Sequence, residues 1–300
     1  MIRSDNLTGA ILMMASMAAF TLNDALMKML AGEIPLFQLI FLRGVLTSVA
    51  VAVIAWRMGV LRTRLPRRDA MLVGWRILAE CCAAYFFLTA LFNMPLANVT
   101  AILAALPLII TLCAAVFFGE PIGWRRIMAI LMGFAGVMLI IRPGTDGFTV
   151  YSLYGLAAVC CVTVRDLTTR RLSPETPSMF VTLLTSVAIM VVFGLASLGD
   201  EWAPLDTRAV VITWGAAVMI IGAYLCSIMV MRVGEISYVA PFRYTGLIWA
   251  LGLGWAIFGD WPDNVTLLGA GIVAGSGVFM LYREAVLARR TRALHGLRPH

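Results

Sequence analysis

The chain has 300 residues, of which 61% are hydrophobic and 13% charged, and its mean hydropathy is +0.93. A soluble domain carries roughly a quarter of charged residues, so this composition indicates a protein of the lipid bilayer. Because a membrane-spanning helix needs about 20 largely apolar residues, the chain holds enough for about nine or ten spans. No length remains for a soluble catalytic domain.

Ten apolar windows, separated by charged residues or by proline and glycine, predict ten transmembrane helices. In chain order they cover residues 8–30, 36–56, 70–92, 97–118, 126–141, 153–171, 176–198, 209–231, 237–258 and 265–283. The first window follows a short polar lead without a small-residue cleavage pattern, so we expect a first span rather than a removable signal. The predicted fold class is an all-α membrane protein.

The basic residues are 22 arginines and one lysine, and they cluster between the windows. If the N-terminus is cytoplasmic, 16 arginines fall in cytoplasmic segments and only Arg142 and Arg208 in the opposite loops. This asymmetry predicts that both termini are cytoplasmic. The net charge of +7 then reflects loops beside anionic membrane lipid, and we expect no nucleic-acid partner.

An internal repeat appears at an offset near 140 residues. The matches are Phe118-Gly119-Glu120 with Phe258-Gly259-Asp260, and Thr21, Asp24 and Lys28 with Thr163, Asp166 and Arg170. Each copy holds five spans, an odd number, so the second copy enters the membrane from the opposite side. The predicted organisation is a first repeat over residues 1–145, a second, inverted repeat over 146–285, and a basic cytoplasmic tail over 286–300.

Several motifs carry a resemblance to a known family. They are the doubled glycine-acid turn followed by a glycine-rich helix, Arg43 in the second span, and Arg170-Arg171 closing the sixth. In these features the chain is similar to the drug/metabolite transporter superfamily, in its EamA-type branch of ten-span proteins. The resemblance implies a secondary transporter of the bacterial inner membrane, with a substrate site near the midplane and alternating access.

Within the superfamily, the chain looks most like the YddG-type amino-acid exporters. This resemblance implies export of amino acids and related small metabolites, without a cofactor. The Asn23-Asp24 pair and Lys28 are also similar to relatives that move larger metabolites such as S-adenosylmethionine or riboflavin.

Ionisable side chains inside the spans are functional candidates because the bilayer makes them costly. Glu80 is expected near the midplane, with Arg76 one turn before it on the same face. Both are predicted to line the cavity, and the alternative is that they only neutralise each other.

Five intramembrane cations face three acids, which favours a substrate carboxylate held by Arg76 or Arg243. The cations are Lys28, Arg43, Arg76, Arg165 and Arg243, and the acids are Asp24, Glu80 and Asp166. We expect Arg43 to anchor a helix end.

Two acid and base pairs recur by the inverted symmetry, Asp24 with Lys28 and Asp166 with Arg170. They are predicted to lie near opposite mouths and to act as gates, the alternative being ordinary pairing at helix ends.

Aromatic residues at Tyr85, Tyr224, Tyr244 and Trp249 are predicted cavity walls, with plain packing as the alternative. Pro107 and Pro241 each remove a backbone hydrogen bond inside a span. The small residues at Ala129 to Gly133 and at Gly271 to Gly275 predict close helix contacts.

Other classes of function fit poorly. The single lysine, Lys28, excludes a phosphate-binding G-x-x-x-x-G-K loop, and the only histidines, His295 and His300, lie in the tail. The six cysteines fall inside apolar windows, so we expect neither disulfides nor a metal site. An intramembrane aspartyl protease is disfavoured because Asp24 and Asp166 are predicted toward opposite mouths, and a channel because no filter sequence appears. We therefore expect no enzyme, while a monomer and a homodimer both remain open.

Overall fold

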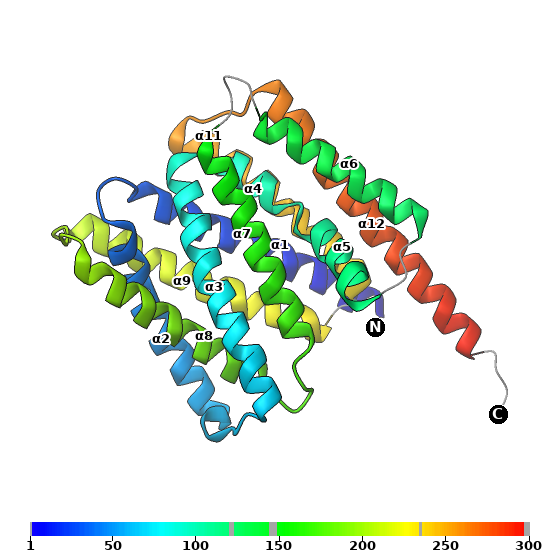
Figure 1. Ribbon diagram of the computed structural model, residues 1–300, viewed down its shortest axis with the longest axis horizontal. Coiled ribbons are helices and arrows are strands. Elements are labelled where there is room, and N and C mark those ends of the chain that lie inside the picture. Colours follow the sequence, from blue (N-terminus) through cyan, green and yellow to red (C-terminus); the bar gives the residue numbers. More distant parts are fainter. Residues whose placement is uncertain (1, 120–122, 144–148, 234–235, 297–300) are drawn as a thin grey trace.

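The computed structural model describes residues 2–119, 123–143, 149–233 and 236–296, and these residues are mainly helical (Figure 1). The longer helices are α1 (Ile2–Met29), α2 (Leu36–Arg57), α3 (Arg67–Asn93), α6 (Trp124–Ile141), α7 (Val150–Arg170), α8 (Ser178–Ala196), α9 (Thr207–Val233) and α12 (Asn264–Gly296). The shorter ones are α4 (Leu96–Leu103), α5 (Leu106–Phe118), α10 (Ile236–Val239) and α11 (Thr245–Phe258), with 3₁₀ turns η1 (Val60–Arg62), η2 (Ser197–Gly199) and η3 (Ala240–Tyr244).

The predicted all-α membrane fold is confirmed. Within the described residues, nine helical stretches are long and apolar enough to cross a membrane. The remaining predicted span, 237–258, is interrupted and consists of α10, η3 and α11. Helix α12 continues to Gly296, so most of the predicted tail 286–300 is helical, and residues 297–300 lie outside the described residues.

Two spans are broken at equivalent places. The fourth breaks at residues 104–105, between α4 and α5, and the ninth at η3, before α11. Pro107 lies in the first turn of α5 and Pro241 in η3, where a missing N–H costs little. Both following helices end on a left-handed glycine, Gly119 at φ +65° and Gly259 at φ +69°. The same local structure thus recurs at an offset of 140 residues, although Glu120 of the doubled turn lies outside the described residues.

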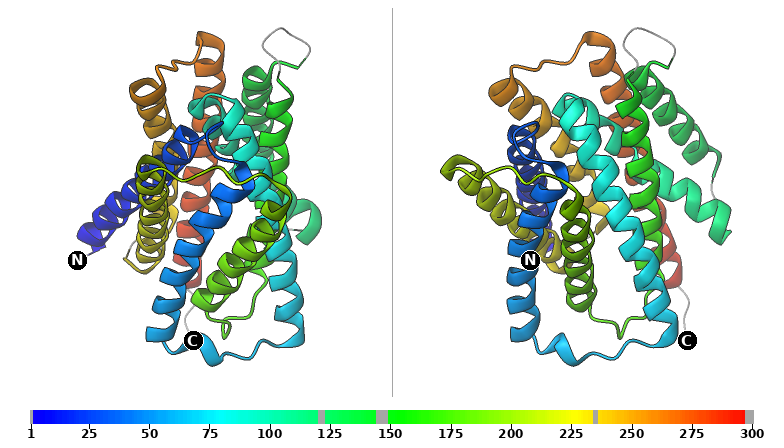
Figure 2. Two further views of the ribbon diagram at one scale, coloured as in Figure 1. Left: turned by 90° about the vertical axis from the view of Figure 1, so that its left-hand side faces the viewer. Right: turned by 60° about the vertical axis from the view of Figure 1, so that its left-hand side comes forward.

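The helices of the two copies interleave in four pairs: α1 packs on α9, α3 on α7, α2 on α8 and α6 on α12. Each pair joins one helix from either copy, so the repeats do not form two separate lobes (Figure 2). The buried core follows this arrangement, because Ile102 of α4 contributes to one cluster with Val159 of α7 and Val273 of α12.

The α6–α12 pair owes its close approach to two glycines. A Cβ atom on Gly136 would lie 2.8 Å from the carbonyl oxygen of Gly269, and one on Gly269 would lie 2.7 Å from that of Gly136. Of the predicted small-residue contacts, Gly133 is confirmed against Leu108 and Ser276. Gly271 and Gly275 have open space at this position, so that part of the prediction is wrong.

Two turns mark the two ends of the bundle. The α1–α2 turn, residues 30–35, and the α7–α8 turn, residues 171–177, lie at opposite ends (Figure 2). We call these the 30–35 end and the 171–177 end. An exposed ion pair between Glu33 and Arg208, 2.7 Å apart, ties the first turn to α9. Asp69 at the start of α3 accepts hydrogen bonds from Ser173 and Thr176 in the second turn.

A third polar link joins the end of α6 to the turn before α12. Arg142 pairs with Asp263, and the backbone N–H of Thr266 donates to the same carboxylate over 2.8 Å. These hydrogen bonds lower the pKa of Asp263 to about 2. The carboxylate therefore stays ionised through the physiological range.

The inverted symmetry is broken at the two ends. Helix α4 packs on α11 toward the 30–35 end. The equivalent contact in the other half would join α5 to α10 or η3. Among the described residues, that contact is much smaller. The structure is therefore more tightly closed at the 30–35 end.

Candidate functional site

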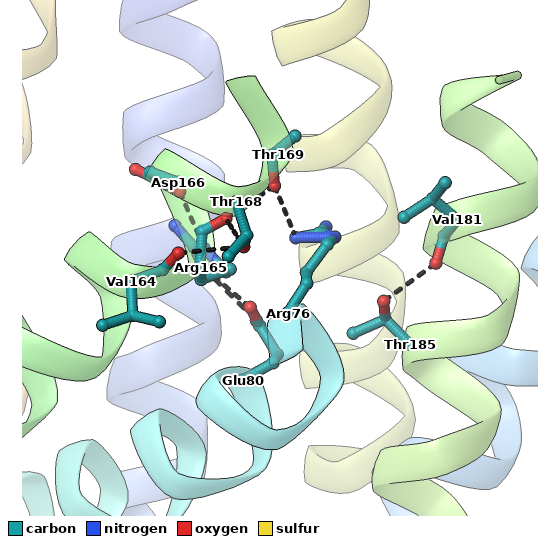
Figure 3. A network of polar contacts seen from close by, with 9 residues as sticks. All are labelled: Arg76, Glu80, Val164, Arg165, Asp166, Thr168, Thr169, Val181 and Thr185. Carbon is teal, nitrogen blue, oxygen red and sulfur yellow. Dashed lines mark hydrogen bonds and ion pairs between the residues drawn. The ribbon is translucent and has the colours of Figure 1, made fainter. Parts of the chain in front are cut away.

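Arg165 of α7 forms two ion pairs inside the bundle, one with Glu80 of α3 and one with its neighbour Asp166 (Figure 3). Nη1 of Arg165 lies 3.3 and 3.2 Å from the two carboxylate oxygens of Glu80, and its Nε lies 2.8 Å from Oδ1 of Asp166. Glu80 is at the midpoint of α3, which at 1.5 Å per residue places it about 20 Å from either end of that helix. One guanidinium thus compensates two carboxylates deep within a span.

A second polar group joins α1 to α2. Nη1 of Arg43 donates to Oδ1 of Asn23 over 3.3 Å, and Nδ2 of Asn23 donates to Oδ1 of Asp24 over 2.9 Å. Arg43 also interacts electrostatically with Asp24 and with Glu80. This interaction connects the second group to the first.

Tyr224 of α9 completes the arrangement. It lies near the charged groups of Glu80 and of the arginines at 43, 76 and 165, and its ring packs edge-on against Phe20 at 5.4 Å. We call the whole set the polar centre: Asn23, Asp24, Arg43, Arg76, Glu80, Arg165, Asp166 and Tyr224. Five helices contribute to it, and its three arginines balance its three acids.

The polar centre is partly accessible. The side chains of Glu80, Arg165 and Asp166 keep 14%, 24% and 28% of their surface exposed. Charged groups in a span are costly unless they are paired or wetted, and these are both paired and reachable. The arrangement can exchange an internal ion pair for one with a small charged molecule.

The alternative that Arg76 and Glu80 neutralise each other is not what the structure shows. Glu80 bonds to Arg165, while Nη1 of Arg76 donates to Oγ1 of Thr169 over 3.3 Å (Figure 3). Both side chains reach from α3 to α7, which pack closely against each other.

The predicted gate pairs are also arranged differently. Lys28 does not bond to Asp24, since its Nζ donates to the carbonyl oxygens of Leu91 (2.9 Å) and Met94 (2.6 Å). The last carbonyls of a helix lack intrahelical donors, so the end of α3 attracts this cation. Nζ also lies 5.5 Å from the ring centre of Phe258, and Lys28 thereby links α1, α3 and α11 at the 30–35 end.

At the other end, Asp166 bonds to its neighbour Arg165, and Arg170 is exposed at the end of α7. Both predicted gate acids, Asp24 and Asp166, therefore belong to the polar centre.

The four aromatic residues predicted to form the cavity wall do not lie together in the structure. Tyr85 joins a ring cluster with Phe37 (6.0 Å), Phe86 (5.4 Å) and Tyr154 (6.3 Å), five residues along α3 from Glu80. Tyr224 lies in the polar centre.

Two other candidates lie elsewhere. The hydroxyl of Tyr244 is directed at Gly277 of α12, and Trp249 lies on the exposed face of α11 with Ile248 and Trp255. Arg243 is exposed on η3.

The sequence predicts Arg43 at a helix end and does not place Arg165 among the site residues. Both carried a usable signal, because each lies well inside a span. Their partners are on other helices, which spacing along one helix cannot reveal. Among the described residues, no group of three or more His, Cys, Asp or Glu side chains could hold a metal ion.

Comparisons with known proteins agree with this architecture. Residues 7–142 match the EamA-like transporter family. The chain is 24% identical to the pseudopaline exporter CntI of Pseudomonas aeruginosa over 89% of its length and 93% of the relative. It is 24% identical to the S-adenosylmethionine uptake transporter of Rickettsia felis, over 93% and 94% respectively.

The riboflavin transporter of Vibrio cholerae is 29% identical over 73% of this chain and 75% of the relative. A solved crystal structure with 21% identity covers 94% of this chain and 98% of its own, with a TM-score of 0.63, and supports the fold. Over residues 7–142 the chain is thus similar to the EamA-like transporter family, and over most of its length it is similar to transporters of small metabolites.

Proposed function

We propose that the protein is a secondary transporter that moves amino acids and related zwitterionic metabolites by alternating access. The supporting observation is the polar centre, where three arginines and three acids meet at the middle of the bundle. A zwitterion brings one charge of each sign, so it can replace an internal ion pair without leaving a net charge in the bilayer. Glu80 is the proposed partner of a substrate ammonium or of a coupled proton.

The substrate range rests on the neighbouring side chains and on the relatives. The ring cluster at Tyr85 supplies an apolar and aromatic surface for a substrate side chain. S-adenosylmethionine, which the Rickettsia felis relative takes up, itself carries an α-amino acid group. The alternative is a larger metabolite without this group, such as riboflavin, which the Vibrio cholerae relative transports.

Orientation and direction are part of the proposal. With both termini in the cytoplasm of a bacterial inner membrane, the 30–35 end faces outward and the 171–177 end inward. The structure is then closed to the outside, with Lys28 among the groups that seal it. Export begins from such a state, in which the polar centre is loaded from the cytoplasm.

Uptake into proteoliposomes tests the proposal. The purified protein is offered labelled phenylalanine, methionine, threonine, lysine, glutamate, S-adenosylmethionine and riboflavin, with and without a proton gradient. Saturable uptake of zwitterionic amino acids is the expected result, and a response to the gradient assigns proton coupling. Uptake of riboflavin alone overturns the amino-acid proposal while keeping a transporter.

A further inference from the structure

The proposed function requires a group that receives the substrate carboxylate. Among the three arginines of the polar centre, Arg43 and Arg165 differ in the charge of their partners. Arg165 already contacts two carboxylates. Arg43 contacts a neutral amide, Oδ1 of Asn23 at 3.3 Å. In the part of the chain that the structure describes, this is the one hydrogen bond of the Arg43 guanidinium.

Asn23 is a spacer between opposite charges. Its side chain is 1% exposed, and the amide uses its oxygen toward Arg43 and its nitrogen toward Asp24. The orientation is defined, because a flipped amide would turn its NH₂ group toward a guanidinium that has only donors. Arg43 and Asp24 therefore attract each other without bonding directly.

The second repeat shows what happens without such a spacer. At the offset of 142 residues that aligns Asp24 with Asp166, the mate of Asn23 is Arg165, which bonds directly to its neighbouring acid. The mate of Arg43 is Thr185, whose hydroxyl donates to Val181 of its own helix (Figure 3). The two copies therefore differ in the partners of their arginines. Arg165 of the second copy is paired with carboxylates, whereas Arg43 of the first copy bonds to a neutral amide.

We propose that Arg43 binds the carboxylate of the substrate and that Asn23 is a positioning residue that keeps Asp24 from occupying this site. The planar guanidinium fork matches a carboxylate in two parallel hydrogen bonds. Asp24 and Glu80 both lie within electrostatic range of Arg43 and supply negative charge for an adjacent ammonium. This assignment rests on the proposed function and names the recognised group as an α-amino acid.

The experiment compares phenylalanine with phenethylamine, which lacks the carboxylate. The KM for labelled L-phenylalanine and the inhibition constant of phenethylamine are measured in proteoliposomes for the wild type, Arg43→Gln, Asn23→Asp and Arg57→Gln. Arg57 lies exposed at the end of the same helix and is the matched control. Asn23→Asp places a carboxylate beside Arg43, so it fills the site while every cation remains.

A lost hydrogen bond between charged groups corresponds to about a 10-fold or larger change in affinity. The KM for phenylalanine is therefore expected to rise about 10-fold or more in Arg43→Gln and Asn23→Asp, with the inhibition constant of phenethylamine unchanged or lower. Arg57→Gln should match the wild type.

An equal loss of affinity for phenylalanine and phenethylamine, or an unchanged KM in Asn23→Asp, overturns the assignment while leaving the proposed function intact. A wild type that transports no zwitterion overturns the proposed function itself, and this assignment with it. Should Arg43→Gln fail to fold, judged by its elution profile and Tm, Asn23→Asp carries the test.

Discussion

Glu80 and Arg165 show why partner choice matters inside a bilayer. Each of these two charges is tolerated in a span because the other helix supplies the opposite charge. Pairing across α3 and α7 also makes the contact sensitive to helix movement, which an Arg76–Glu80 pair within α3 would not be. A substrate that enters this contact can therefore change how the helices pack.

Glu80→Gln tests this residue directly. Glutamine keeps the shape and one hydrogen bond to Arg165 but removes the negative charge, so we expect substrate transport to fall by about 10-fold or more. Uptake in proteoliposomes measures the effect. Glu33→Gln, in the exposed ion pair at the 30–35 end, is the control and should keep more than half of the activity. Normal transport by Glu80→Gln would remove this residue from the mechanism.

For Tyr244 we expect a substitution to change stability and not transport. Its hydroxyl is buried against Gly277 and, among the described residues, has no hydrogen-bond partner. A buried unsatisfied polar group costs about 1–3 kcal/mol. Tyr244→Phe should therefore raise the thermal unfolding temperature in detergent and leave transport unchanged. A loss of transport with unchanged stability would show instead that the hydroxyl serves the substrate.

The residues of the centre could be predicted only in part. The depth of Glu80, Asp24 and Asp166 in their spans marks them as functional candidates, because a carboxylate inside the bilayer is energetically costly. Their partners were predicted from spacing along one helix. Lys28 shows the limit of that approach, since backbone carbonyls at the end of another helix bind it, and no side-chain pattern encodes such a partner.

At the scale of single elements, Lys28 closes one end of the bundle by joining α1 to the end of α3. Lys28→Met keeps the length of the side chain and removes its donors, so the closed state should lose about 2 kcal/mol or more relative to the open one. Hydrogen exchange of residues 88–96 should become faster. Arg208→Gln, in an exposed ion pair at the same end, should change the exchange little. Equal exchange in Lys28→Met and the wild type would contradict a sealing role.

The α6–α12 contact is defined by particular glycines. Gly269→Leu forces a side chain against the backbone of Gly136 and should cost about 1–3 kcal/mol of stability. Gly271→Leu, two residues along the same helix in open space, is the control. Thermal unfolding in detergent compares them, and similar melting temperatures would contradict the packing described here.

Element boundaries and breaks follow largely from local sequence. Pro107 and Pro241 each remove a backbone hydrogen bond, and the structure breaks the fourth and ninth spans beside them. The spacing of Gly271 and Gly275 was misleading, because a small-residue pattern shows that a helix can approach another without showing which face does so.

At the scale of the whole molecule, the ten predicted spans and the all-α class could be read from hydropathy alone. The interleaving could not, because it depends on which helix of one copy packs on which helix of the other. This pairing brings Arg165 of the second copy to Glu80 of the first. The polar centre is therefore a product of the tertiary arrangement.

The asymmetry between the two ends has a functional meaning in this account. In a pseudo-symmetric bundle, each repeat can adopt the conformation of the other. The α4–α11 contact then opens as the equivalent contact of α5 with α10 or η3 closes. The polar centre is then reached from one end at a time.

Counterflow tests this central claim most directly. Proteoliposomes loaded with unlabelled L-phenylalanine are diluted into a trace of the labelled amino acid, and the label inside is followed with time. A single site that is loaded alternately from both ends predicts a transient accumulation of label above its outside concentration, which Glu80→Gln slows by about 10-fold or more. Entry of label that only equilibrates, with or without internal phenylalanine, would contradict alternating access.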